Sequence, residues 1–273
     1  MTWIEVFLNG GLVVLAAVLA LWLLSLALRD SSIVDIFWGP GFVLTAGAYT
    51  LLAPGELTGR AGLALALVAA WGLRLGLHLL VRNWGRQEDF RYAAWRRQHG
   101  PRWVWVSLFQ VFLLQGLILW VVSAPLVSAI LGRRPLGWLD GLAVLAWAVG
   151  FFFEAVGDWQ LARFKADPAN KGRLLTGGLW RYTRHPNYFG DALQWWGLYL
   201  LAVSAGGWWT LFSPLIMTYL LLKVSGVSLL ERTLETRPGY EDYMRRTSAF
   251  VPWKPQHSKS SAAAGKGTGE GGL

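Results

Sequence analysis

Residues 4–28, IEVFLNGGLVVLAAVLALWLLSLAL, decide the fold class of this chain. A helix rises about 1.5 Å per residue, so this run is long enough to cross the ~30 Å hydrocarbon core of a bilayer. No basic region precedes the run, and Arg29-Asp30 follows it in place of a small-residue cleavage site. We therefore expect a membrane helix rather than a signal peptide.

Apolar runs of similar length recur along most of the chain. The chain is 54% hydrophobic, and many of its 18 tryptophans lie near the ends of apolar runs, as in interfacial aromatic belts. The spacing predicts an all-α, polytopic membrane bundle of about seven transmembrane helices, forming a single transmembrane catalytic domain over residues 1–256. The expected spans are 4–28, 32–53, 62–82, 104–131, 138–160, 188–205 and 208–230. Residues 257–273 are rich in Gly, Ser, Ala and Lys, which predicts a disordered tail.

The distribution of charge predicts the orientation of the bundle. The chain carries a formal net charge of +9, and most basic residues follow the first, third and fifth runs or lie in the C-terminal segment. The positive-inside rule then places the N-terminus outside and the C-terminus in the cytoplasm, in a multi-pass protein of a bacterial inner membrane. We interpret the positive charge as the result of membrane topology together with a binding site for a polyanionic ligand. We expect membrane lipids as partners, and no nucleic acid. The sequence leaves the oligomeric state open.

Residue types limit the possible chemistry. The chain has no cysteine and only four scattered histidines. These counts exclude a thiol nucleophile, a disulfide framework and a cysteine metal site, and they make a histidine metal site improbable, so we predict no metal.

Polar residues inside the expected spans are functional candidates, because burying a charge in the bilayer is costly. Asp35 begins the second span, with Trp38 on the same face, and is interpreted either as a helix-start carboxylate or as an acid that faces a substrate cavity. The sequence Gly39-Pro40-Gly41 is expected to break or kink that helix. In the third span, Arg74 and His78 lie one turn apart on one stripe.

The C-terminal half has the densest set of polar residues. Asn187, Asp191 and Gln194 follow each other at i, i+4 and i+7, so they share one helical face. Glu154 and Asp158 form a second pair suited to hydrogen bonding a sugar or an amide. The loop between Asp158 and Asn187 contains the glycine pair Gly177-Gly178 and several cations, which suit a phosphate-rich ligand that approaches the backbone. These cations are Lys165, Lys171, Arg173, Arg181 and Arg184.

The stretch GGLWRYTRHPNYFGD (177–191), with YEDY (240–243) and VPW (251–253), resembles the steroid 5α-reductase superfamily, in wording closest to its bacterial membrane branch. The resemblance implies an enzyme that uses NADPH to reduce the C4–C5 double bond of a 3-oxo-Δ4-steroid or a similar hydrophobic enone lipid. A hydride passes to C5, and a placed donor stabilises the negative charge that develops on the carbonyl oxygen.

The resemblance also implies a set of cofactor residues. Asn187 matches an asparagine that contacts the nicotinamide, Asp191 a glutamate one turn later, and Asp158 an aspartate near the ribose. Lys165 and Arg173 are matched to phosphate contacts, and Glu231 and Arg232 to the family's C-terminal cofactor contacts. Tyr182, Arg184 and His185 belong to the shared motif, and Arg91 and Tyr92 resemble a bacterial-branch motif.

On the substrate side, Arg74 matches an arginine of the third span, and we group it with His78 and Asp35 as catalytic candidates. Asp35 is the nearest candidate for the group that polarises the enone, and Trp71 stands where its tyrosine partner is expected. Trp38 and Trp71 are then the expected substrate-binding residues. Glu154 departs from the family, in which eukaryotic members have an asparagine.

Two other classes of function remain open on sequence grounds. One is a membrane methyltransferase that uses S-adenosylmethionine, of the lipid or isoprenylcysteine type, because such enzymes share an Arg-His-Pro-x-Tyr style of motif. That cofactor has no phosphate, so it gives no reason for the cations to gather. The other is a non-catalytic lipid transporter or scaffold, which predicts no nucleotide affinity.

Overall fold

A computed structural model describes residues 1–224 and 226–256, except for the side chains of residues 228, 229, 232 and 233. Within these residues the chain is all-helical, with no β-strand and one isolated bridge between Thr183 and Ser248. The fold class predicted from the sequence is confirmed in this respect. The expected tail, 257–273, lies outside the described residues.

The first half of the chain contains three long helices followed by a series of short ones. The long helices are α1 (Trp3–Leu28), α2 (Ile33–Leu52) and α3 (Gly59–Asn83). The short segments follow one another with hardly a break: α4 (Phe90–His99), η1 (Gly100–Arg102), α5 (Trp103–Ser107), the π-helix η2 (Leu108–Leu113), α6 (Leu114–Val122) and α7 (Ala124–Leu131).

The second half has two long helices and a shorter C-terminal set. The long helices are α8 (Trp138–Ala166) and α9 (Pro186–Ser204), joined by a loop with the 3-10 turns η3 (Pro168–Asn170) and η4 (Gly178–Arg181). The rest are η5 (Trp208–Leu211), α10 (Phe212–Tyr219), the π-helix η6 (Leu220–Val224), α11 (Val227–Leu234) and α12 (Tyr240–Arg246).

We predicted one domain over 1–256, and the structure divides these residues into two compact units. Unit 1 comprises Met1–Phe151 and Ala192–Tyr219. Unit 2 comprises Phe152–Asp191 and the described residues between Leu220 and Gln256. Unit 2 therefore holds the C-terminal part of α8, the loop after it, the first turn of α9, and α11 and α12.

Four helical stretches of the described chain are long and apolar enough to cross a membrane: Trp3–Leu28, Gly59–Asn83, Phe90–Leu131 and Trp138–Ala166. Large apolar side chains on them are exposed, such as Leu12 at 63% and Leu77 at 62%, as expected for lipid-facing surfaces. These features indicate a membrane protein, while the count of seven spans and the orientation stay predictions.

The last expected span, 208–230, differs from the structure. The helical stretch from Trp208 ends at Val224, and a separate helix, α11, begins at Val227. Gly226 between them leaves the helical region, with φ −114° and ψ −111°. Its missing side chain permits this conformation, so residues 227–230 belong to α11 rather than to a continuous span.

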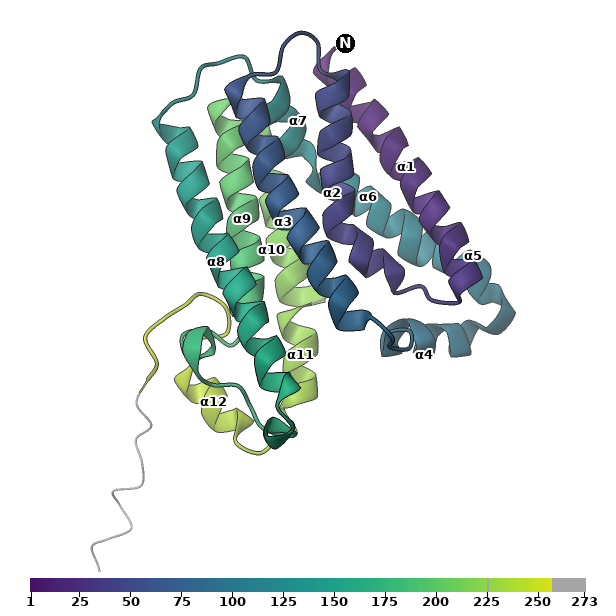
Figure 1. Cartoon of the computed structure of the whole chain (residues 1–273), viewed down its shortest axis with the longest axis vertical. Helices are drawn as coiled ribbons and strands as arrows, with labels where there is room; N and C mark the ends of the chain where they lie inside the picture. The colour runs from purple at the N-terminus through teal and green to yellow at the C-terminus, as the bar shows by residue number, and fades with distance from the viewer. Residues whose placement is uncertain (225, 257–273) are drawn as a thin grey trace, which may run out of the picture. The chain divides into compact units, whose positions relative to one another are not determined.

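Within unit 1, α2 and α3 lie side by side (Figure 1) and meet at two glycines. A Cβ atom added to Gly39 would lie 2.3 Å from the carbonyl oxygen of Gly72, so only glycine permits this approach. We expected Gly39-Pro40-Gly41 to break or kink the helix; α2 continues through Pro40 as one helix, so the break does not occur, and the kink stays a prediction. The small residues are used to pack α3 instead.

A buried arginine ties three helices of unit 1 together. Arg60, 1% exposed at the start of α3, donates from Nε to Asp140 Oδ1 of α8 at 2.8 Å and from Nη2 to Ser204 Oγ of α9 at 2.9 Å. Its Nη1 donates to the carbonyl of Arg134 at 2.8 Å. No pattern in the sequence pairs Arg60 with Asp140 or Ser204, so this network was not predicted.

Candidate functional site

The loop after α8 is held against that helix by side-chain contacts within unit 2. Trp180 Nε1 donates to the carbonyl of Gly157 at 3.2 Å, and the backbone N–H of Leu179 donates to Gln160 Oε1 at 3.0 Å. Gly178 has φ +61°, and a Cβ there would lie 2.5 Å from Gln160 Nε2. Gly178 therefore makes room for Gln160, whereas a Cβ at Gly177 would meet nothing within 4 Å. The approach of a phosphate to the backbone of this pair stays a prediction.

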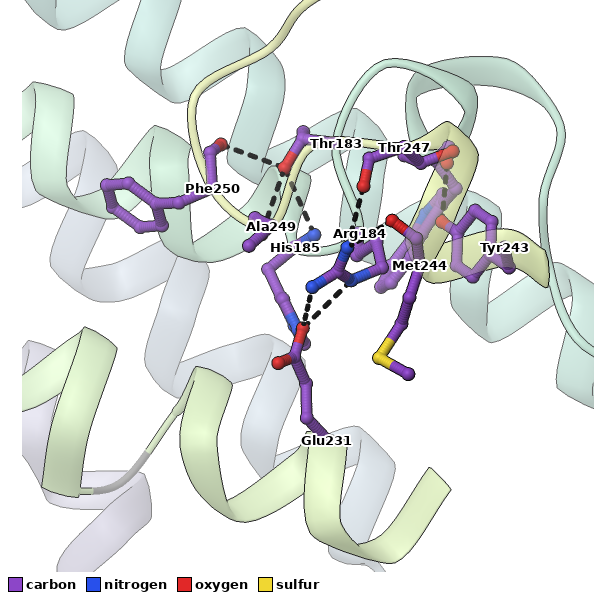
Figure 2. Close-up of polar contacts among 10 residues, drawn as sticks. Thr183, Arg184, His185, Glu231, Tyr243, Met244, Thr247, Ala249 and Phe250 are labelled. Carbon is purple, nitrogen blue, oxygen red and sulfur yellow. Dashed lines mark hydrogen bonds and ion pairs between the residues drawn. The ribbon is translucent and has the colours of Figure 1, made fainter. Parts of the chain in front are cut away.

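Arg184 braces the start of α9 against both C-terminal helices (Figure 2). Its Nε and Nη2 donate to Glu231 Oε1 of α11 at 2.8 and 2.6 Å. Its Nη1 donates to the carbonyls of Thr247 at 2.7 Å and Met244 at 3.1 Å, at the end of α12. Because this guanidinium is committed to internal partners on every nitrogen, its charge serves to hold the fold of unit 2 together.

The chain after α12 returns along residues 182–184. The N–H of Arg184 donates to the Ser248 carbonyl at 2.9 Å, and the Thr183 hydroxyl donates to the Phe250 carbonyl at 2.8 Å (Figure 2). The N–H of Trp253 donates to the Tyr182 carbonyl at 2.9 Å. Two of the three stretches that carry the family resemblance, 177–191 and 251–253, are therefore in direct contact.

His185 is a neutral side chain in this arrangement. It is 2% exposed, its ring stacks on Tyr188, and its Nε2 lies 3.4 Å from Glu231 Oε1. Burial lowers the pKa of His185 to about 4, although the Glu231 carboxylate opposes this shift. The imidazole then donates from Nε2 to Glu231 and keeps an acceptor on Nδ1, which has no hydrogen-bond partner among the described residues.

These contacts enclose a basic pocket of about 490 Å³ within unit 2. The loop 165–175 forms one side, and α11, α12 and the turn between them form the other. Apolar and aromatic side chains such as Trp180, Tyr240 and Leu234 line it. Its charged lining has five cations and one carboxylate: Lys165, Lys171, Arg173, Arg184, Arg237 and Asp167.

This lining is suited to an anionic ligand that also has a flat or apolar part. Cations converge on phosphate through charge-assisted hydrogen bonds, and aromatic rings pack against planar groups. Burial raises the pKa of Tyr240 to about 12, with the Glu231 charge acting in the same direction, so Tyr240 stays a neutral phenol at physiological pH.

Four predicted cofactor residues line the pocket, namely Lys165, Arg173, Arg184 and His185. Lys171 and Arg237 also line it but were not among the predicted site residues. Lys171 is visible in the sequence as one more cation of the basic loop. Arg237 follows an amphipathic helix at a Pro-Gly turn, and nothing local in the sequence connects it to that loop.

The other predicted cofactor residues of unit 2 lie outside the pocket lining. Asn187 donates from Nδ2 to Asp158 Oδ1 at 3.0 Å, which joins α9 to α8, and Asp191 is half-buried one turn further on. Tyr182 is 43% exposed, and Glu231 binds Arg184. The side chain of Arg232 lies outside the described residues.

In unit 1, the structure brings three predicted residues together. Asp35, at the start of α2, accepts from Arg91 Nη2 at 2.9 Å and from the Tyr92 hydroxyl at 2.8 Å. Gln115 Nε2 of α6 donates to the same hydroxyl at 3.2 Å. We predicted Asp35 as a catalytic residue and Arg91 and Tyr92 as cofactor contacts, so the sequence had not grouped them.

The acidic residues before α4 form further contacts with the start of α2 and with α4. Glu88 accepts from Arg96 Nη2 at 2.7 Å and from the N–H of Ser31 at 2.7 Å. Burial raises the pKa of the Glu88 carboxyl, but the hydrogen bonds from Arg96 and Ser31 outweigh that effect, and its pKa lies below the usual range. The motif Glu88-Asp89-Phe90-Arg91-Tyr92 thus holds α4 against the start of α2, and α4 runs at an angle to α1–α3 (Figure 1).

The remaining candidates lie on α2 and α3. Trp71 is 1% exposed and packs with Phe42 and Trp195, while Trp38 meets Phe42 edge-on at 5.7 Å. Arg74 and His78 are half-buried on one face of α3. Trp71 is therefore part of the aromatic core of unit 1, with Trp38 at its edge.

No cluster of three or more His, Asp or Glu side chains that could hold a metal ion occurs among the residues that the structure describes.

Comparisons with known proteins identify a family and a yeast relative. The model of a family described as "Protein of unknown function (DUF1295)" matches residues 21–247. An uncharacterized protein of Schizosaccharomyces pombe is 26% identical over 264 residues, covering 85% of this chain and 75% of the yeast protein. No solved structure matches the chain.

Proposed function

Since the chain belongs to the DUF1295 family, which falls in the steroid 5-alpha-reductase-like group, we propose that it is an NADPH-dependent membrane reductase. Its substrate is a hydrophobic enone lipid, a 3-oxo-Δ4-steroid or a molecule with the same conjugated carbonyl. The product is the saturated ketone.

The observation that carries the proposal is the basic pocket of unit 2. It has five cations, aromatic walls and a volume of about 490 Å³, within the range of small-molecule sites. Lys165 and Arg173, matched to phosphate contacts on the family resemblance, both line it. These residue types fit a cofactor that carries phosphates and flat rings.

When bound, NADPH supplies the hydride that reduces the double bond. Lys165 and Arg173 hold its phosphates, and Asn187, oriented by its hydrogen bond to Asp158, is the proposed contact for the nicotinamide amide. The neutral His185 holds the first turn of α9, which carries Asn187, near α11 through Glu231.

On the substrate side, Asp35 and Tyr92 are the proposed groups at the enone carbonyl. Reduction adds a hydride to the β-carbon, moves the double-bond electrons toward the carbonyl oxygen, and is completed when a proton from water adds to the α-carbon. A hydroxyl donor lowers the barrier by stabilising the charge on that oxygen. The Tyr92 hydroxyl donates its single proton to Asp35 and accepts from Gln115, so to act as such a donor it exchanges Asp35 for the substrate oxygen.

The proposal is tested by ligand binding to the protein purified in detergent. We expect NADPH to raise the melting temperature, with S-adenosylmethionine having no effect, and we expect turnover of testosterone or progesterone with NADPH oxidation. Stabilisation by S-adenosylmethionine alone would identify a methyltransferase. No stabilisation by either molecule, and no turnover, would favour the transporter or scaffold.

Substitution of the α9 face gives a second test. Asn187→Ala and Asp191→Ala should each abolish NADPH binding while the protein still folds, because both remove polar groups proposed to face the cofactor. Binding is measured by titration calorimetry, and folding by circular dichroism and size exclusion. Glu241→Ala is the control, because Glu241 is an exposed carboxylate of α12 that does not line the pocket, and this variant should bind NADPH as the wild type does. Normal binding by both site variants would refute the site assignment.

A further inference from the structure

The cations that line the basic pocket differ in what they already contact. Arg184 is committed to Glu231 and to two backbone carbonyls, so its charge is largely neutralised inside the protein. In contrast, Lys171, Arg173 and Arg237 are exposed, and their side chains have no hydrogen bond or ion pair with any other residue that the structure describes.

These three cations come from two segments on opposite sides of the pocket. Lys171 and Arg173 follow the 3-10 turn η3, where backbone bonds from Lys171 N–H to the Pro168 carbonyl and from Arg173 N–H to the Asn170 carbonyl fix the loop. Arg237 lies in the turn between α11 and α12, where its N–H donates to the Leu234 carbonyl at 2.9 Å. These hydrogen bonds fix the backbone at all three residues, and the charged groups of their side chains are available to bind a ligand.

Like charges without counter-ions repel, so gathering three of them at one pocket disfavours the empty state. One carboxylate, Asp167, lines the pocket with them, and it is occupied in the η3 turn, where it accepts from the N–H of Ala169 at 2.9 Å. A phosphate group brings two or more negative charges and several acceptor oxygens, and it can bind cations from both sides at once.

We propose that Lys171, Arg173 and Arg237 form a phosphate clamp that closes the basic pocket around the phosphate of a nucleotide. Arg173 was already matched to a phosphate contact and Lys171 was predicted only as one cation of the basic loop, whereas Arg237 was not predicted from the sequence. The clamp deepens the proposed function and rests on it for the identity of the nucleotide, whereas its affinity for phosphate itself is a property of the three cations.

The test compares Lys171→Gln, Arg173→Gln and Arg237→Gln with the wild type in the full-length purified protein. Arg181→Gln is the matched control. The sequence predicted Arg181 as one of the cations suited to phosphate, but in the structure it is exposed and does not line the pocket. Two probes are used: inorganic pyrophosphate, followed by thermal stabilisation and calorimetry, and NADPH. Each clamp variant should weaken the binding of both probes about 10-fold or more, because each loses a charge-assisted hydrogen bond, and Arg181→Gln should bind both as the wild type does.

The outcomes separate the clamp from the proposed function. If pyrophosphate binds in a clamp-dependent way while NADPH does not bind the wild type, the clamp stands and the reductase proposal falls. If NADPH binds the wild type and all three clamp variants equally well, the clamp is refuted and the reductase proposal stands. The clamp is also refuted if the wild type binds neither probe, or if Arg181→Gln weakens binding as much as the clamp variants do.

Discussion

Arg184 donates to a carboxylate and two backbone carbonyls, whereas Lys171, thirteen positions earlier in the same basic loop, has no side-chain partner among the described residues. The sequence presents both simply as cations next to a glycine pair. Their roles differ because Glu231, which is distant in sequence, contacts Arg184 and does not contact Lys171. The charge of a residue can be read locally, but the partner that neutralises it cannot.

His185 provides a prediction at the same scale. Its pKa is lowered from the ordinary 6.5 to about 4 by burial, so between these values the unfolded chain binds a proton that the folded protein excludes. Stability is therefore lost as the pH falls from about 6.5 to about 4, by up to about 3 kcal/mol for a shift of this size. We expect the melting temperature of wild type to drop over this window.

The matched variant is His185→Gln, whose amide can still donate to Glu231 but does not titrate. The drop in melting temperature between pH 6.5 and 4.5 should be smaller in this variant by several degrees. The difference between the two profiles removes the contribution of the carboxylates that both proteins share. Parallel profiles would show that His185 does not exclude a proton on folding.

Among the helices, the decisive contacts are polar ties between segments far apart in sequence. Arg60 of α3 binds Asp140 of α8 and Ser204 of α9, with side-chain exposures of 1% for Arg60 and 5% for Asp140. A paired buried charge is tolerated because both partners are satisfied, but removal of one partner leaves the other uncompensated. The tie therefore fixes which helices meet.

We expect Arg60→Ala to destabilise unit 1 by about 3–5 kcal/mol, because it leaves the buried Asp140 carboxylate without its cationic partner. The hydrogen bonds from the Ser204 hydroxyl and the Gly137 N–H remain, but they do not neutralise the charge. The double variant Arg60→Met/Asp140→Leu removes both charges and should be much less destabilised than the single one. Unfolding in mixed detergent micelles, followed by circular dichroism, measures both values. Equal stability of Arg60→Ala and wild type would mean that the tie contributes nothing to packing.

The orientation of the whole molecule in the membrane is defined by the loops that face the cytoplasm. Four helical stretches of the described chain are long and apolar enough to cross a membrane, and α3 is one of them. If α3 spans the bilayer, the loops at its two ends lie on opposite sides. The distribution of basic residues predicts that the loop after α3 and the loop after α8 both face the cytoplasm.

The chain has no cysteine, so single cysteines report topology without background. In intact cells, a membrane-impermeant maleimide should label Glu56→Cys, in the loop before α3, and should leave Gln87→Cys and Ala169→Cys unlabelled. All three should react after lysis, which controls for accessibility. Labelling of Gln87→Cys or Ala169→Cys in intact cells would contradict the predicted orientation.

The sequence by itself determined the helical membrane class, the approximate bounds of most helices and the region where the polar chemistry gathers. These depend on hydropathy and spacing over one or two dozen residues, which are local properties of the chain. It also placed Lys165, Arg173, Arg184 and His185 in one candidate site, and all four line the pocket.

Only the tertiary structure decided which polar groups are partners. Asp35 meets Arg91 and Tyr92, Arg60 meets Asp140, and Glu231 binds Arg184. Each pair joins residues about fifty or more positions apart, and no periodicity encodes such a distance. Arg237 was overlooked for the same reason, because it reaches the pocket only through the packing of α11 and α12, which depends on the folded chain as a whole.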